Sequence, residues 1–417
     1  CPSRPEGLFG LTAAVTHRRR PVLGKLKILR ACHAGFNREF YKSKFYGQSS
    51  YEDACESLRS SSMLYPNDFA STMRQQGFEV LEVIIDLPEL ASLWYGARQP
   101  RLGIEFLCDV IAEFKPDVLY CHPVFLLDGE QRSQIRQSYP FVRLIGGYCG
   151  YLPDDLMYFK DCDFILSTFP SALEAWRRAG VETRLLHHGI DDRFVGRVAD
   201  SAPIDFSFFG STGWGFHTHF RRYWLLRRLI ERGTGLKVWG MEAVRPSPPP
   251  PPGVFQALTH ALEVLRARRS RPSDAVCLRD MTLEPDPEGL PWFAKAPPLR
   301  EIFPNRIMAP LHGPAYLSAL AASRVTVNCH TSISEEGFNM RMFEATGMRT
   351  CLLTDHRIGI EELFEPGKEI MVYNTIEECI DMARFLKKNA AARSAMAAAG
   401  HRRTLAEHTS SARLKVV

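Results

Sequence analysis

Apolar residues along this chain fall into short runs that are separated by longer stretches with a helical repeat. Runs of this length and composition are typical of strands buried on both faces of a sheet. Those of the first half are KLKILRACHAG, GFEVLEVIID, PDVLYCHPVF, FVRLIGGYCG and DCDFILSTF. Helical patterns such as Tyr51 to Gln76 and Arg101 to Phe114 lie between them. A regular alternation of strand and helix predicts a parallel, doubly wound sheet.

The same pattern begins again near Ile204. The strand IDFSFFGSTGWG runs into a glycine turn, and FHTHFRRYWLLRRLIERG then places apolar residues at positions 220, 223, 226 and 230 on one helix face. Further strands are expected in LKVWG, SRVTVNCH, RTCLLTD and EIMVY. The fold class is therefore α/β, with two Rossmann-like domains whose sheets face each other across a cleft. Ligands of such sheets bind at the carboxyl ends of the strands.

The boundaries follow from these patterns and from composition. Residues 1–24 read as a flexible lead-in, and residues 25–195 form the first Rossmann-like domain. The second domain covers residues 204–400, with a proline-rich insertion over 246–300 that contains the tract SPPPPPG. We expect a C-terminal helix over 401–417 that crosses back to the first domain.

Inside the insertion, a helix is expected over 254–269, and the basic run RARRSR occupies 266–271. Such a run is either a solvated basic end or a contact for an acidic lipid or acceptor.

Composition and charge narrow the classes of function. The chain has 417 residues, of which 45% are hydrophobic and 24% charged, and a formal charge of +5. This balance suits an anionic small molecule or an acidic membrane surface and is too weak to indicate nucleic acid. The eleven cysteines occur singly, without a C-x-x-C pair, which favours reduced thiols in a cytosol. We expect a cytoplasmic protein without a membrane helix; peripheral membrane contact and a homodimer stay open.

One segment near the end of the second domain breaks a rule of helix chemistry. In SEEGFNMRMFEATG, residues 334–347, Asn339 suits an N-cap, so Arg341 falls in the first turn of a helix. The helix dipole disfavours a cation there. A phosphate bound at the helix N-terminus would make the arginine favourable there, because guanidinium and phosphate form charge-assisted bonds. The pattern therefore indicates a diphosphate site, with Asn339 and Arg341 beside the anion.

Two carboxylates flank this cation. Glu336 precedes the helix and Glu344 lies on its second turn. A carboxylate can accept two hydrogen bonds from a vicinal diol, so one could hold a ribose and the other a sugar hydroxyl. The alternative is that Glu336 is solvated and Glu344 balances Arg341 within the helix.

These residues form an E-x7-E pattern after a strand of the second domain, which resembles the signature of retaining GT-B glycosyltransferases. The longer strings at 339–355, 363–378 and 400–413 are similar to the CgeB/YkvP type, named after spore-maturation proteins. The likeness runs from about Lys25 to the C-terminus and is strongest over the last 90 or so residues, whereas the proline-rich insertion departs from it.

The resemblance implies the GT-B fold, binding of the nucleotide ribose by Glu344 and contact of Glu336 with the donor sugar. The strand PDVLYCH resembles the D-V-x-x-x-H strand of the same enzymes, which implies that His122 faces the donor sugar. A hydrogen-bonded histidine at a strand end is the alternative. We also expect His33 and Gly35, in the first strand-to-helix turn, to line the acceptor side.

The glycine turn GSTGWG opens the second domain. Its glycines let the backbone approach a diphosphate, beginning with Gly210, while Ser211 and Thr212 add hydroxyl donors and Arg221 or His217 could assist. A plain tight turn is the alternative. Because the G-x-x-G-x-G order differs from the dinucleotide fingerprint, a nicotinamide-dependent enzyme with Glu242 on the ribose is disfavoured but stays open.

Three Cys-His pairs end strands, at Cys32-His33, Cys121-His122 and Cys329-His330. They lack the short-range spacing of structural zinc sites, so we expect no metal.

The sequence therefore predicts transfer of a hexose-like sugar from a nucleoside-diphosphate donor to an acceptor hydroxyl, without a cofactor. The acceptor is open among a glycan, a lipid-linked glycan, a protein and a small molecule. A sugar-nucleotide epimerase of the same fold, and a non-catalytic nucleotide-sugar-binding protein in envelope or spore assembly, are the competing predictions.

Overall fold

The computed structural model describes residues 25–34, 41–43, 47–61, 67–150, 155–197, 201–243, 296–332 and 334–415. The expectations for Gly35, for the lead-in over 1–24 and for residues 246–295 of the insertion, with their helix and basic run, lie outside these ranges.

The N-terminal half forms a parallel sheet of six strands in the order β2-β1-β3-β4-β5-β6. The strands are β1 Lys27–Cys32, β2 Glu79–Ile84, β3 Val118–His122, β4 Leu144–Cys149, β5 Phe164–Ser167 and β6 Glu182–Leu185. The helices are α2 Tyr51–Ser61, α3 Asn67–Gln75, α4 Pro88–Tyr95, α5 Gly103–Phe114, α6 Gly129–Ser138 and α7 Pro170–Arg178, with short 3-10 turns η2 Val124–Leu126, η3 Leu156–Phe159 and η4 Asp192–Phe194. The helical pattern expected over Tyr51 to Gln76 contains α2 and α3, and residues 62–66 between them lie outside the described ranges.

The C-terminal half forms a second parallel sheet in the order β12-β11-β10-β7-β8-β9. Its strands are β7 Ile204–Ser211, β8 Lys237–Met241, β9 Ile307–Met308, β10 Ser323–Asn328, β11 Cys351–Asp355 and β12 Met371–Tyr373. Its helices are α8 Phe220–Glu231, α11 Leu299–Ile302, α12 Gly313–Ala321, α13 Met340–Gly347, α14 Ile360–Leu363, α15 Ile376–Lys388, α16 Ala390–Glu407 and α17 Ser410–Leu414, with the 3-10 turn η5 His217–His219. The expectation of two doubly wound parallel sheets is confirmed.

The apolar runs become the centres of the sheets because helices cover both of their faces. Every residue of β11 is buried, as are all those of β10 except Arg324. Helix α8 is buried beyond its apolar stripe, since the side chains of Arg221, Arg222, Arg227 and Arg228 are also buried. Buried guanidinium groups need polar or anionic partners, so α8 is a place to look for a site.

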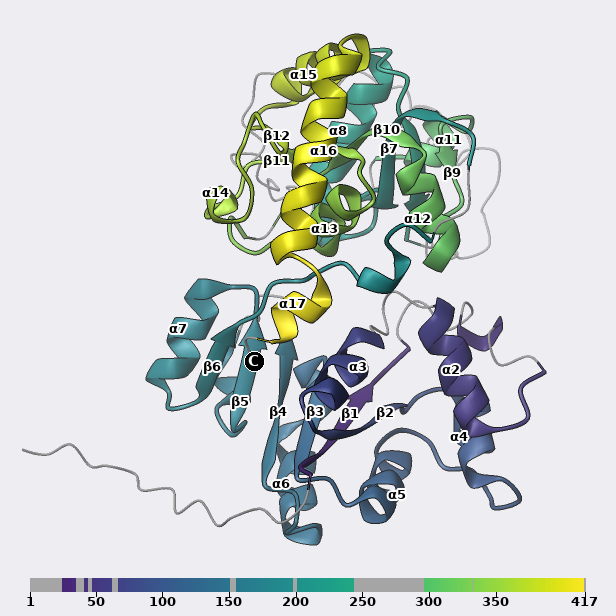
Figure 1. Ribbon diagram of the computed structural model, residues 1–417, viewed down its shortest axis with the longest axis vertical. Coiled ribbons are helices and arrows are strands. Elements are labelled where there is room, and N and C mark those ends of the chain that lie inside the picture. The colour runs from purple at the N-terminus through teal and green to yellow at the C-terminus, as the bar shows by residue number, and fades with distance from the viewer. Residues whose placement is uncertain are drawn as a thin grey trace, which may run out of the picture.

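The last helices connect the two domains (Figure 1). Helix α16 packs along α13 and β11, and α17 then contacts α3 of the first domain. Residue Ile190 pairs with Thr409 in a parallel bridge, and Leu414 packs in the same apolar cluster as Ile28 and Phe69. This chain crossing brings the carboxyl ends of both sheets toward one another.

In the part of the chain that the structure describes, no helix combines the length and the apolar character needed to cross a membrane.

Candidate functional site

A cavity of about 330 Å³ lies between the two domains, a volume within the usual range of ligand sites. We name it the interdomain pocket. Its walls come from the segments that follow the carboxyl ends of β4, β5, β7 and β10 and from the first turns of α8 and α13. The lining residues are Gly150, Thr168, Phe169, His188, Gly210, Ser211, His219, Arg222, His330, Thr331, Gly337, Phe338, Asn339, Met340 and Arg341. The pocket therefore occupies the place at which parallel sheets bind ligands.

Arg341 stands at the second position of α13, as the sequence predicts, and Asn339 occupies the N-cap. The Asn339 side chain does not cap the helix; its Nδ2 donates to Asn328 Oδ1 at 3.0 Å. The Arg341 guanidinium lies against Gly210, where an added Cβ would stand 2.7 Å from Nη1, and 5.9 Å from the centre of the Phe208 ring. Its Nε is buried, and no residue in the described part of the chain forms a hydrogen bond with it. The glycine turn and the helix N-terminus thus meet around one cation.

A second guanidinium, that of Arg222, lines the same pocket and is only 6% exposed. It donates to Cys329 O at 2.7 Å and to Ser211 Oγ at 3.0 Å, both uncharged acceptors. Burial, reinforced by repulsion from Arg341 and Arg357, lowers its pKa to about 10. Neither Arg222 nor Arg341 forms an ion pair with any residue in the described ranges. The pocket wall consequently carries two guanidinium groups that form no ion pair with a described residue.

The side chain of His219 also lines the pocket and is affected by the charges of the same arginines. Burial, followed by the charges of Arg222, Arg341 and Arg357, lowers the pKa of His219 to about 3. Burial makes the larger contribution to this shift, and the three guanidinium groups add to it. Guanidinium groups at the wall of a pocket suit the oxygens of a phosphate.

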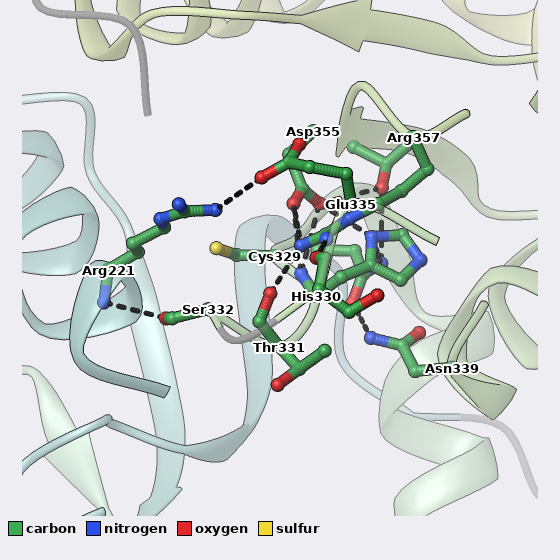
Figure 2. A network of polar contacts seen from close by, with 12 residues as sticks. Arg221, Cys329, His330, Thr331, Ser332, Glu335, Asn339, Asp355 and Arg357 are labelled. Atoms are coloured by element: carbon green, nitrogen blue, oxygen red, sulfur yellow. Dashed lines mark hydrogen bonds and ion pairs between the residues drawn. The ribbon is translucent and has the colours of Figure 1, made fainter. Parts of the chain in front are cut away.

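The sequence predicted that Arg221 assists in binding the diphosphate, but in the structure it is Arg222 that lines the pocket. The Arg221 guanidinium pairs with Glu335 at 3.2 Å, and its backbone N–H donates to Ser332 Oγ at 3.1 Å (Figure 2). Consecutive helix residues point about 100° apart, and of the two arginines it is Arg222 that lines the pocket. The sequence contains both arginines and no signal that separates them.

Of the two hydroxyl side chains in the glycine turn, that of Ser211 lines the pocket and that of Thr212 does not. Ser211 lines the pocket and accepts from Arg222, but Thr212 is fully buried and donates to Glu242 Oε1 at 3.3 Å. Glu242 also accepts from the backbone N–H of Leu299 at 2.7 Å. Thr212 and Glu242 therefore hold the segment that enters α11, and neither of them lines the pocket.

The two carboxylates of the E-x7-E pattern do not meet. Glu344 is 5% exposed and accepts from the Tyr316 hydroxyl at 2.7 Å. Burial raises its pKa, although Arg341 and the Tyr316 hydrogen bond oppose that shift. Glu336 reaches instead to the first domain, where its Oε2 accepts from the backbone N–H of Ser171 at 3.1 Å. Glu336 is thus half-buried, does not line the pocket, and bridges the domains at the start of α7 through an exposed hydrogen bond.

A second cavity of about 130 Å³ adjoins the pocket and shares His188 and Met340 with it. Glu344 and His122 both line this cavity. The His122 ring stacks on Tyr148 at 5.0 Å, and burial followed by the charge of Arg30 holds its pKa well below the ordinary value.

The sequence reasoning missed His187 and His188, which also line the second cavity. His188 Nε2 lies 3.1 Å from the Tyr148 hydroxyl. The pair of consecutive histidines after a strand could have indicated these two residues in the sequence. His33 lines neither cavity; its exposed ring lies 6.2 Å from that of Phe125.

Within the described ranges, no group of three histidine, cysteine or carboxylate side chains is arranged to hold a metal ion.

Residues 284–417 match the model of a family described as glycosyl transferase-like. A comparison with curated protein sequences gives no match. Among solved structures, the chain is similar to sucrose-phosphate synthase from Thermosynechococcus elongatus, with 11% identity, a TM-score of 0.55 and coverage of 94% of this chain and 97% of the other. It is similar to the Anabaena protein HepE in complex with UDP and glucose, with 12% identity, a TM-score of 0.51 and coverage of 94% and 98%. A third similar structure is the N-terminal domain of Candida albicans trehalose-6-phosphate phosphatase, with 9% identity, a TM-score of 0.51 and coverage of 95% and 97%.

At such identities the likeness is one of fold, and it agrees with the two facing parallel sheets. The expected GT-B architecture is confirmed: the chain has two Rossmann-like domains with a pocket between them, and residues 284–417 are similar to the glycosyl transferase-like family.

Proposed function

We propose that this protein transfers a sugar from a nucleoside-diphosphate donor to an acceptor hydroxyl. The observation that carries the proposal is the pair Arg222 and Arg341, which line the interdomain pocket without an ion pair to any described residue. Two cations beside a glycine turn and a helix N-terminus match the charge of a diphosphate. The UDP and glucose in the complex of the similar Anabaena protein support a nucleotide-sugar ligand.

The departing diphosphate is the group that needs stabilisation during such a transfer. In our proposal Arg341, Arg222 and the first N–H groups of α13 supply it without a metal, because their positive charge is already fixed before the reaction. Glu344 would hold the ribose. Closure of the domains over the pocket would exclude water that otherwise hydrolyses the donor.

The first domain would supply the acceptor side, with His122 and His188 beside the donor sugar. Glu336 would contact the donor sugar only after it releases the Ser171 N–H, so donor binding and domain movement are coupled in this proposal. Retention of the anomeric configuration is proposed from the E-x7-E likeness, with attack on the face that the diphosphate leaves. Membership of the CgeB/YkvP type is proposed from the strings at 339–355, 363–378 and 400–413.

The test is incubation of the purified chain with UDP-, GDP-, dTDP- and ADP-sugars, alone and with a panel of glycan, lipid-linked, protein and small-molecule acceptors. Free nucleotide and sugar isomers are followed by chromatography. Nucleotide release that accelerates with one acceptor class supports transfer. Isomer formation from donor alone indicates an epimerase, and thermal stabilisation without turnover indicates a binding protein. No stabilisation and no turnover with any donor would refute the nucleotide-sugar site itself.

A further inference from the structure

His330 is a buried polar side chain that the proposed diphosphate chemistry does not use. It follows β10, lines the interdomain pocket and is 1% exposed. Its Nδ1 lies 2.7 Å from Asp355 Oδ1, at the end of the neighbouring strand β11. Its Nε2 is buried and has no hydrogen-bond partner among the described residues. One ring nitrogen is therefore fixed by the protein, and the other has no partner among the described residues although the side chain lines the pocket.

The Asp355 carboxylate decides which nitrogen carries the proton. It accepts from the His330 backbone N–H at 3.0 Å and from Arg357 Nη2 at 2.9 Å (Figure 2). Arg357 is itself held by the carbonyl oxygens of Thr331 and Ser334. Burial disfavours the charged carboxylate, but His330 and Arg357 outweigh it and lower the pKa of Asp355 below its ordinary range. An ionised acceptor beside Nδ1 requires Nδ1–H, so Nε2 presents a lone pair.

A lone pair on His330 Nε2 determines whether a phosphate oxygen or a hydroxyl group of a ligand can bind beside it. Burial, with the nearby charges of Arg357 and Arg222, lowers the pKa of His330 against the opposing effect of Asp355, so the ring is neutral near pH 7. A neutral Nε2 acceptor repels a phosphate oxygen and binds a hydroxyl group, which can donate to it. Arg222 and Arg341 line the same pocket, so it contains both anion-binding and hydroxyl-binding groups.

We propose that His330 Nε2 accepts a hydrogen bond from a hydroxyl of the transferred sugar and thereby selects donors that carry a hydroxyl at that position. Asp355 is the positioning residue that fixes the tautomer. The proposal rests on the nucleotide-sugar function and adds to it a specificity-determining contact on the side of the sugar.

The experiment compares binding of UDP and UDP-glucose, or of the corresponding pair with the base selected by the donor panel, by titration calorimetry. His330→Phe removes the acceptor and keeps a planar ring, whereas His330→Gln restores an oxygen close to the place of Nε2. His356→Phe, one residue after Asp355 and partly exposed, is the matched control. Circular dichroism melts verify that each variant is folded.

For His330→Phe we expect UDP-glucose affinity to fall about tenfold, as for loss of one buried hydrogen bond, with UDP affinity unchanged within about twofold. His330→Gln should recover part of the loss. One of the 2-, 3-, 4- and 6-deoxyglucose donors should bind the wild type about tenfold more weakly and show no difference in His330→Phe. Equal losses for UDP and UDP-glucose, or no loss for either, would overturn the proposal.

A second measurement does not depend on the variants that replace His330. Nitrogen-15 spectra of histidine-labelled protein distinguish the Nδ1–H from the Nε2–H tautomer, and we expect Nδ1–H at His330, with a mixture of tautomers in Asp355→Asn. An Nε2–H signal in the wild type would refute the lone-pair argument. If no nucleotide sugar binds the wild type, the proposed function fails; if donors bind and the His330 variants do not discriminate, only this inference fails.

Discussion

Replacement of Arg222 by glutamine is the sharpest perturbation of the proposed diphosphate site. The change removes one of the two guanidinium groups that form no ion pair with a described residue, and it keeps a polar, uncharged side chain. Arg221→Gln is the matched comparison, because the neighbouring arginine lies on the same helix and is directed to Glu335. The pair tests whether the structure has identified the right arginine.

The structure gives the expected size of two effects of this replacement, one on the stability of the empty protein and one on the affinity for the donor. The shift of the Arg222 pKa from 12.5 to about 10 corresponds to about 3 kcal/mol by which the empty pocket disfavours the charge. Losing two hydrogen bonds to uncharged acceptors costs a comparable amount, about 1–3 kcal/mol in total. The free energy of unfolding of the empty Arg222→Gln protein should therefore change little. In the complex, a lost charge-assisted bond is worth about 1.5–3 kcal/mol, so donor affinity should fall roughly tenfold to a hundredfold.

The assay is titration calorimetry with UDP-glucose, or the donor selected by the panel, together with urea unfolding of the empty proteins. We expect Arg222→Gln to lose affinity and Arg221→Gln to stay within about twofold of the wild type. A loss of affinity in Arg221→Gln with none in Arg222→Gln would refute the reasoning from burial and charge. Equal and large losses of stability in both variants would show that the arginines of α8 serve the core alone.

Three further predictions concern neighbouring groups. Gly210→Ala should weaken donor binding about tenfold, since its Cβ would stand 2.7 Å from Arg341 Nη1, whereas Gly233→Ala, with nothing within 4 Å, should strain only the backbone. Glu344→Gln and Arg341→Ala should each weaken donor binding in calorimetry about tenfold without unfolding the protein; unchanged affinity in both would contradict the site assignment. Burial lowers the pKa of His188 from 6.5 to about 4. The unfolded chain therefore binds the extra proton, and stability present above pH 6.5 falls toward pH 4, by about 1–2 kcal/mol at pH 5. His188→Gln should remove this part of the pH dependence in urea unfolding.

Much of the architecture could be predicted because buried parallel strands leave a local signature. Apolar runs such as those of β10 and β11 are continuous, and turns or helices end them, so both sheets follow from the sequence. The two-residue strand β9 was not predicted, because a pattern that short has no period.

The sequence by itself determined that a cation stands in the first turn of α13, which is a local conflict with the helix dipole, and an anion site there is the prediction that follows. It did not determine which residues complete the site. Arg222 rather than Arg221, Ser211 rather than Thr212, and the orphaned nitrogen of His330 depend on the side of an element that faces the cleft. That choice is made by contacts between segments more than a hundred residues apart, such as Arg222 with Cys329, and only the tertiary structure contains them.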